Sequence, residues 1–243
     1  FVSSDGAQSW QLVEGLWNRP ERLGWFGGGY PEPGIHSICP HPTDAADLLV
    51  AVSCAGVWRS RDAGVSWQVH CKGLRADFLP PEQAEDPNGQ DPHRVQRCAA
   101  APEVLWMQHH CGIWRSDDHA QVWRELRAQP SSFGFAVAAH STDPNTAWFA
   151  PAVKDMQRVP VDGALCVTRT RDGGHSFEVL REGLPQQHCY DLVYRHGLEV
   201  AADGQTLLMG STTGNLWTSF DAGNHWQHVF GHLPPIAALR FAP

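Results

Sequence analysis

Lysine is nearly absent from this sequence of 243 residues: only Lys72 and Lys154 occur, and the arginines form no cluster. The formal net charge is −8. An acidic chain without a basic stripe argues against nucleic acid as a partner and against an anionic membrane surface. The chain also lacks a run of about 18 apolar residues, the length that predicts a transmembrane helix.

Paired cysteine motifs are absent as well. The seven cysteines are an odd number, and none of them forms a CxxC pair. This pattern favours free thiols in a reducing compartment over a disulfide framework, so we expect a cytoplasmic protein. No signal peptide is visible. The sequence begins at Phe1, inside a repeat, so a leader before this residue is still an alternative.

Tryptophan is abundant, with 11 residues against 3 tyrosines and 3 methionines, which is typical of a repeat that uses one tryptophan per unit. Five segments fit the pattern Ser/Thr-x-Asp-x-Gly-x-x-Trp, with Ala replacing Gly in two of them and Phe replacing Trp in one. These segments, called boxes below, are residues 3–10, 60–67, 116–123, 170–177 and 219–226.

The five box aspartates are Asp5, Asp62, Asp118, Asp172 and Asp221, at steps of 57, 56, 54 and 49 residues. A repeat of about 50 residues with β-like segments between the boxes predicts an all-β propeller of four-stranded antiparallel blades. Each box joins the third strand of a blade to the fourth. The box aspartates are therefore expected to accept hydrogen bonds inside a hairpin turn and not to act in catalysis.

The whole chain is interpreted as a single, partial propeller domain. Residues 1–16 end one blade, full blades cover 17–70, 71–127, 128–182 and 183–231, and 232–243 open a closing blade. The opening strands are predicted at 35–39, 95–98, 135–139 and 192–194. This alignment puts His36, His93, Phe135 and Asp191 at matching levels of neighbouring blades.

Several segments outside the boxes carry a family resemblance. They are 76–80, 90–93 (Gln-Asp-Pro-His), 108–112 (Gln-His-His-Cys-Gly), 168–174 and 210–214. With the boxes, they make the chain similar to a bacterial BNR/Asp-box propeller family whose label is glycosyl hydrolase or sialidase-like. The resemblance implies a soluble protein of seven blades, whose N-terminal blades are missing here. It also implies glycosidase activity, but the arginine triad and the Tyr/Glu nucleophile pair of sialidases have no recognisable counterpart.

Candidate functional residues come from the blade face where opening strands start and second strands end, and from two long connections, 71–92 and 151–164. Asp77, Asp91 and Asp155 are the candidate acid and base of a hydrolase. The candidate ligand-binding residues are His36, His93, His109, His110, Lys154, Arg158 and Tyr190. A divalent metal such as zinc is a further candidate, held by His36, His93 and either His109 or, in the set we favour, His110, with Asp91 assisting.

Three functions stay open at this point. The first is a carbohydrate or small-molecule site with hydrolytic carboxylates. The second is a metal site at the channel mouth. The third is a non-catalytic scaffold that binds a protein partner, in which the histidines only form hydrogen bonds around a wet channel.

Overall fold

The structure is a computed structural model that describes residues 1–242. Within these residues the strands form four separate four-stranded antiparallel sheets. The strands are β1 (Ile35–Pro40), β2 (Leu48–Val52), β3 (Gly56–Ser60), β4 (Gln68–Val69), β5 (Pro92–Arg97), β6 (Leu105–His109), β7 (Gly112–Ser116), β8 (Arg124–Leu126), β9 (Gly134–Ala139), β10 (Ala147–Pro151), β11 (Val167–Thr170), β12 (Glu178–Leu180), β13 (Leu198–Val200), β14 (Leu207–Gly210), β15 (Leu216–Ser219) and β16 (Gln227–Phe230).

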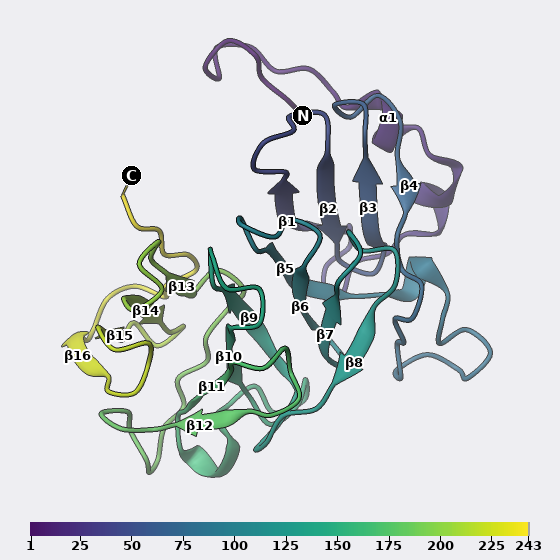
Figure 1. Cartoon of the computed structure of the whole chain (residues 1–243). Coiled ribbons are helices and arrows are strands. Elements are labelled where there is room, and N and C mark those ends of the chain that lie inside the picture. The colour runs from purple at the N-terminus through teal and green to yellow at the C-terminus, as the bar shows by residue number, and fades with distance from the viewer. Residues whose placement is uncertain (243) are drawn as a thin grey trace.

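The sheets follow one another around an arc, with the opening strands β1, β5, β9 and β13 on its inner side (Figure 1). Each sheet runs in chain order from its opening strand to its fourth strand, and a box joins the last two strands. This is the β-propeller architecture that the repeat predicts. A short helix α1 (Glu14–Trp17) and the 3₁₀ turns 20–24, 87–89 and 161–163 lie in the connections.

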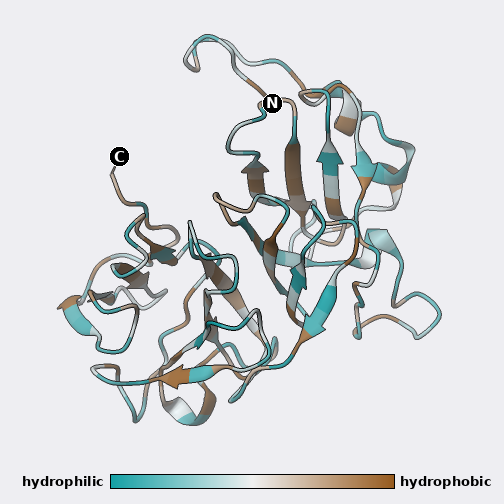
Figure 2. Ribbon diagram, viewed as in Figure 1, coloured by the Kyte–Doolittle hydropathy of each residue, from teal (hydrophilic) through white to brown (hydrophobic). Residues whose placement is uncertain are grey.

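Apolar side chains are buried between neighbouring sheets. One cluster joins the first two sheets through Leu49, Met107 and Trp114, and another joins the last two through Trp148 and Met209. The strand β2 is hydrophobic along its length, while the outer strands β4 and β8 combine hydrophilic and hydrophobic residues (Figure 2). Burial between sheets therefore holds the blades against one another. Among the described residues, no helix has the length and apolarity to cross a membrane.

Each box is a hydrogen-bonded turn. In the second box the hydroxyl of Ser60 accepts from the N–H of Gly64 at 2.8 Å, and Asp62 accepts from the N–H of Ser66 at 2.8 Å. The hydroxyl and backbone N–H of Ser66, with the hydroxyl of Ser60, lower the pKa of Asp62 from 3.8 to about 2. The Asp62 carboxylate therefore has a structural role, as an acceptor of hydrogen bonds within the turn.

Alanine in the glycine position leaves the turn formed. Ala120 adopts φ of 66°, where glycine has no steric penalty, yet its N–H still reaches the hydroxyl of Ser116 at 3.0 Å. The local strain is therefore tolerated by a turn whose other hydrogen bonds are complete.

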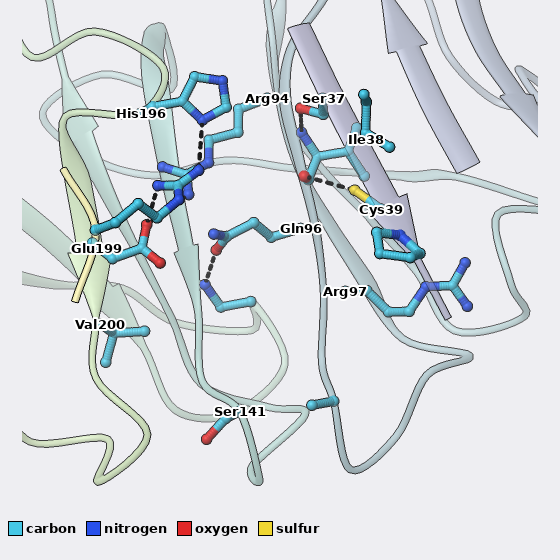
Figure 3. Close-up of a pocket in the computed structure, with 15 residues that line it drawn as sticks. Ser37, Ile38, Cys39, Arg94, Gln96, Arg97, Ser141, His196, Glu199 and Val200 are labelled. Carbon is cyan, nitrogen blue, oxygen red and sulfur yellow. Dashed lines mark hydrogen bonds and ion pairs between the residues drawn. The ribbon is translucent and has the colours of Figure 1, made fainter. Parts of the chain in front are cut away.

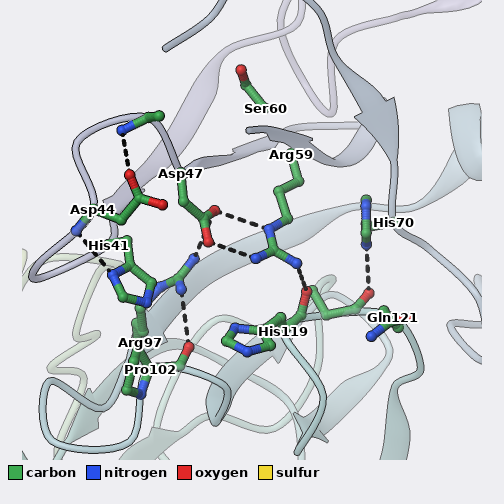
Figure 4. Close-up of polar contacts among 12 residues, drawn as sticks. His41, Asp44, Asp47, Arg59, Ser60, His70, Arg97, Pro102, His119 and Gln121 are labelled. Carbon is green, nitrogen blue, oxygen red and sulfur yellow. Dashed lines mark hydrogen bonds and ion pairs between the residues drawn. The ribbon is translucent and has the colours of Figure 1, made fainter. Parts of the chain in front are cut away.

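An arginine on the third strand of a blade contacts the next blade. Arg59 donates to the backbone oxygen of His119 in the following box, and Arg169 donates to that of Ala222 in its own following box. Arg115 occupies the same position in the second sheet and reaches Asn145 of the third. Arg59 also forms a buried ion pair with Asp47, at 2.5 Å (Figure 4).

The opening strand of the fourth sheet lies later than predicted. It spans Leu198–Val200, and residues 192–194 form no strand although Leu192 and Val193 are buried. Leu198 pairs with Met209 as Val95 pairs with Met107, so His196, and not Asp191, occupies the level of His93. Asp191 instead accepts hydrogen bonds from Ser211 and Asn215 in the loop after β14.

The Arg59→Met variant tests the clamp between the first two sheets. Removing the guanidinium leaves Asp47 buried with only the more distant Arg97, whose Nη2 lies 3.7 Å away. We expect the free energy of unfolding in urea to fall by about 3 kcal/mol, the usual cost of breaking a buried ion pair. The control is Arg61→Met, because Arg61 is exposed. Equal stability of the two variants would contradict a role for the clamp.

Candidate functional site

A cavity of about 360 Å³ is lined by strand residues of the second and third sheets and by loop residues next to the first and fourth. Asp91 and His93 come from the start of β5, His110 follows β6, Phe135 lies on β9, and Arg195 precedes β13. The remaining lining residues come from connecting segments and include Phe26, Gly27, Gly28, Gly29, Cys54, Phe78, Asp155 and Arg158. A hollow of this size suits a small molecule.

Asp91 is the central polar group of the cavity, and its side chain is only 7% exposed. Its Oδ1 accepts from the hydroxyl of Ser53 at 3.0 Å, while Oδ2 lies 3.4 Å from Nδ1 of His110 and 3.5 Å from Nε2 of His93. Burial alone would raise the pKa of Asp91, but its hydrogen bonds to His110 and His93 outweigh burial and hold it well below the usual range. The carboxylate is therefore ionised.

His93 presents a lone pair to this carboxylate. Its Nδ1 lies 2.7 Å from the backbone oxygen of Gly134, and a carbonyl oxygen can only accept, so Nδ1 carries the proton. Burial lowers the pKa of His93 and favours the neutral ring. In the neutral ring Nε2 faces Oδ2 of Asp91 as a second electron-rich atom. The pair is stabilised either by a proton on Nε2, which gives the hydrogen bond that lowers the pKa of Asp91, or by a bound cation in its place.

Two of the three separations between these ligand atoms are close to those of a metal site. One ligand atom each from Asp91, His93 and His110 lies within 4.8 Å of the other two. Bond lengths of about 2.0–2.1 Å in a tetrahedral zinc site put neighbouring ligand atoms about 3.3 Å apart. The 3.4 and 3.5 Å separations from Oδ2 of Asp91 are close to that value. Three protein ligands leave one coordination position open.

Second contacts orient the three side chains. The carbonyl of Gly134 fixes the ring of His93, and the hydroxyl of Ser53 holds the other oxygen of Asp91. Such outer hydrogen bonds are typical of protein metal sites. A Cβ on Gly28 would lie 3.0 Å from the Ser53 hydroxyl and 3.3 Å from Oδ2 of Asp91, so a side chain here would crowd both groups and glycine favours this close approach.

His109 and His110 are adjacent in sequence but differ in role. His109 is fully buried, and burial lowers its pKa to about 3. Its ring nitrogens face the backbone N–H groups of Asp91 at 3.0 Å and Cys111 at 3.1 Å. His109 thus holds two chain segments, and His110 points into the cavity.

Not every predicted site residue reaches the cavity. Asp155 and Arg158 line it and form an ion pair with each other. Lys154 and Tyr190 are exposed and outside the lining, and Asp77 pairs with Arg75 at the surface. His36 also stands outside the Asp91–His93–His110 group.

The position of His36 corrects the predicted set of three histidine ligands. A bulge at the start of β1 accompanies a hydrogen bond from Nδ1 of His36 to the backbone oxygen of Pro92, at 2.9 Å. Asp91 occupies the third place in the group instead. Burial, followed by the charge of Arg195, lowers the pKa of His36 to about 4.

Sequence reasoning missed three parts of the cavity: the glycine run 27–29, Phe78 and Arg195. The glycine run was a visible signal, since consecutive glycines permit close approach to other groups. Arg195 was hidden by the misplaced opening strand, because it precedes β13 by three residues.

A second cavity, of about 330 Å³, lies along the inner strands (Figure 3). Arg94 lines it and forms an ion pair with Glu199 at 3.0 Å. It also donates to the backbone oxygens of Arg195 and Leu198. Arg94 thus connects the second sheet to the fourth, and its positive charge is neutralised by Glu199.

No protein-family model matches the chain, and no curated protein sequence matches it either. Solved structures do resemble it. An ancestral GH74 enzyme has a TM-score of 0.60 at 16% identity over 81% of this chain, and the GH74 xyloglucanase from Xanthomonas campestris has 0.56 at 18% over 79%. YCF48 from Cyanidioschyzon merolae has 0.54 at 14% over 80%.

These similarities establish the propeller fold. The chain spans 24% and 29% of the two GH74 chains and 55% of the YCF48 chain. Membership of the BNR/Asp-box family in particular stays a prediction.

The His109→Leu variant tests whether His109 has a structural role that the adjacent His110 lacks. It removes the acceptor of one buried N–H group, because a neutral imidazole accepts at only one of its two ring nitrogens, and such a loss costs about 1–3 kcal/mol. We expect the free energy of unfolding in urea to fall by that amount, whereas His110→Ala should change it by less than about 1 kcal/mol because His110 is partly exposed. A larger loss for His110→Ala would reverse the assigned roles.

Proposed function

We propose that this propeller binds a divalent transition-metal ion with Asp91, His93 and His110, and binds a small molecule at the open coordination position. The observation that carries the proposal is the convergence of one ligand atom each from Asp91, His93 and His110 within 4.8 Å, with the two separations from Asp91 Oδ2, 3.4 and 3.5 Å, close to those of a tetrahedral site. Two imidazoles and one carboxylate suit zinc and neighbouring first-row metals.

The chemical capacity of such a site is metal-assisted hydrolysis. A metal bound by three protein ligands lowers the pKa of a coordinated water to about 7. The residues of this chain would hold the ligand set rigid through Ser53 and Gly134 and would enclose the small molecule between Phe135 and the glycine loop 27–29.

Glycoside hydrolysis by two carboxylates is a second candidate, supported by the fold shared with GH74 enzymes. Asp91 and Asp155 both line the cavity. A glycosidase, however, needs one carboxyl group that stays protonated. The lowered pKa of Asp91 favours its ionised form, and Asp155 is paired with Arg158. Metal binding therefore explains this carboxylate better than acid catalysis does.

A non-catalytic scaffold is the third candidate. A propeller from a nidogen/laminin complex has a TM-score of 0.57 at 10% identity over 84% of this chain. Several large apolar side chains before β1 are exposed, among them Trp10, Trp17, Leu23 and Tyr30. These side chains offer a surface for a protein partner that is separate from the metal site.

Zinc titration of the chelator-treated chain tests the proposal. We expect isothermal titration calorimetry to show one zinc ion per chain. Asp91→Asn and His110→Ala should each weaken binding at least about 100-fold, because each removes one of three ligands. Zinc should also raise the melting temperature of the wild-type chain.

His175→Ala is the matched control, since His175 is exposed and lies outside the cavity. It should bind zinc as the wild type does. The proposal fails if the wild-type chain binds no zinc, or if the loss in His110→Ala equals that in His175→Ala.

A further inference from the structure

Arg195 has a guanidinium group without a protein partner at the cavity wall. Its Nε is buried and makes no hydrogen bond within residues 1–242, and no ion pair in that range includes it. The side chain lines the same cavity as Asp91. The side chain as a whole is partly exposed, but a buried N–H of a cation without an acceptor is unfavourable, so this group points to a ligand that completes it.

The backbone holds Arg195 in this position. Its carbonyl oxygen accepts from Nη1 of Arg94 at 2.7 Å. Its Cζ lies 5.5 Å from the ring centroid of Phe135, which stacks on His93 at 4.4 Å. One aromatic ring therefore separates this cation from a member of the metal-ligand group.

Arg158 approaches the same ring from another segment. Its Cζ lies 5.3 Å from the centroid of Phe135, and its charge is paired with Asp155. Among the charged lining residues, two carboxylates (Asp91 and Asp155) balance two guanidinium groups (Arg158 and Arg195). A bound divalent cation would add two positive charges that the cavity itself does not neutralise.

We propose that the small molecule bound in this cavity carries an oxyanion, a phosphate or a carboxylate, and that Arg195 binds it beside the metal ion. The proposal rests on the metal site proposed above. An oxyanion offers one oxygen to the open coordination position and others to the planar donors of the guanidinium group. A neutral sugar would leave both Arg195 and the excess charge unmatched.

The experiment compares three probes on the zinc-loaded chain by calorimetry: inorganic phosphate, acetate and glucose. The variants are Arg195→Gln and, as control, Arg127→Gln, whose side chain is 85% exposed at the surface. Zinc affinity and the melting temperature are measured on the same samples, which separates loss of metal or of folding from loss of anion binding.

We expect phosphate, acetate or both to bind the wild type and Arg127→Gln, and glucose to bind neither. Arg195→Gln should keep its zinc but bind the anion roughly 10- to 100-fold more weakly, the effect of losing a charge-assisted hydrogen bond. Binding of phosphate but not acetate would identify a phosphorylated ligand, and the reverse a carboxylate ligand. Both results support the proposal.

Other outcomes overturn it. If zinc binds but neither anion does, the anion proposal is wrong and the metal site stands. If Arg195→Gln binds the anion as tightly as the wild type, Arg195 is not the recognition residue. If zinc does not bind, the proposed function fails. Anion binding that still requires Arg195 would then support recognition by this residue alone.

Discussion

The contact of a third-strand arginine with the next blade is the constraint on which the site depends. Arg59 and Arg169 each donate to a backbone oxygen in the following box, and Arg115 reaches the following sheet. Because the cavity takes residues from several blades, a rotation of one sheet would move the lining residues of neighbouring blades apart. The packed tryptophans between sheets and the arginine contacts both oppose that rotation.

A second set of contacts between sheets, nearer the axis, uses histidine. His36 donates to the carbonyl of Pro92, and His93 donates to that of Gly134, which is the corresponding position one sheet later. His196 completes the set, with Nε2 lying 2.9 Å from the carbonyl of His36. A structural role for these histidines and a ligand role are therefore compatible: the bond that joins the sheets through Nδ1 of His93 also directs its Nε2 at Asp91.

The repeat was sufficient to predict the propeller, because box spacing and strand alternation are local properties of the sequence. The cavity was only partly predictable. His93 and His110 came from the alignment of blades, but the place of Asp91 between them depends on the bulge near Pro92, which no pattern in the sequence reports. Leu192 and Val193 resemble a strand in the sequence because both are apolar. They are buried in the structure, but the hydrogen bonds of Asp191 hold this segment outside the sheet.

The charged residues of the cavity lie where the repeat is interrupted, whereas His93 and Phe135 lie on regular strands, and this explains how one chain supports both a regular scaffold and a specific cavity. Asp91 ends the long connection after β4, Asp155 and Arg158 lie in the insertion after β10, and Arg195 lies in the extra turn before β13. The polar groups of box residues, by contrast, form hydrogen bonds within their own turns, as the carboxylate of Asp62 does. Asp155 and Arg158 neutralise each other within their insertion. For the other two charges our proposal is a bound ligand: a cation shared with two imidazoles at Asp91, and an anion at Arg195.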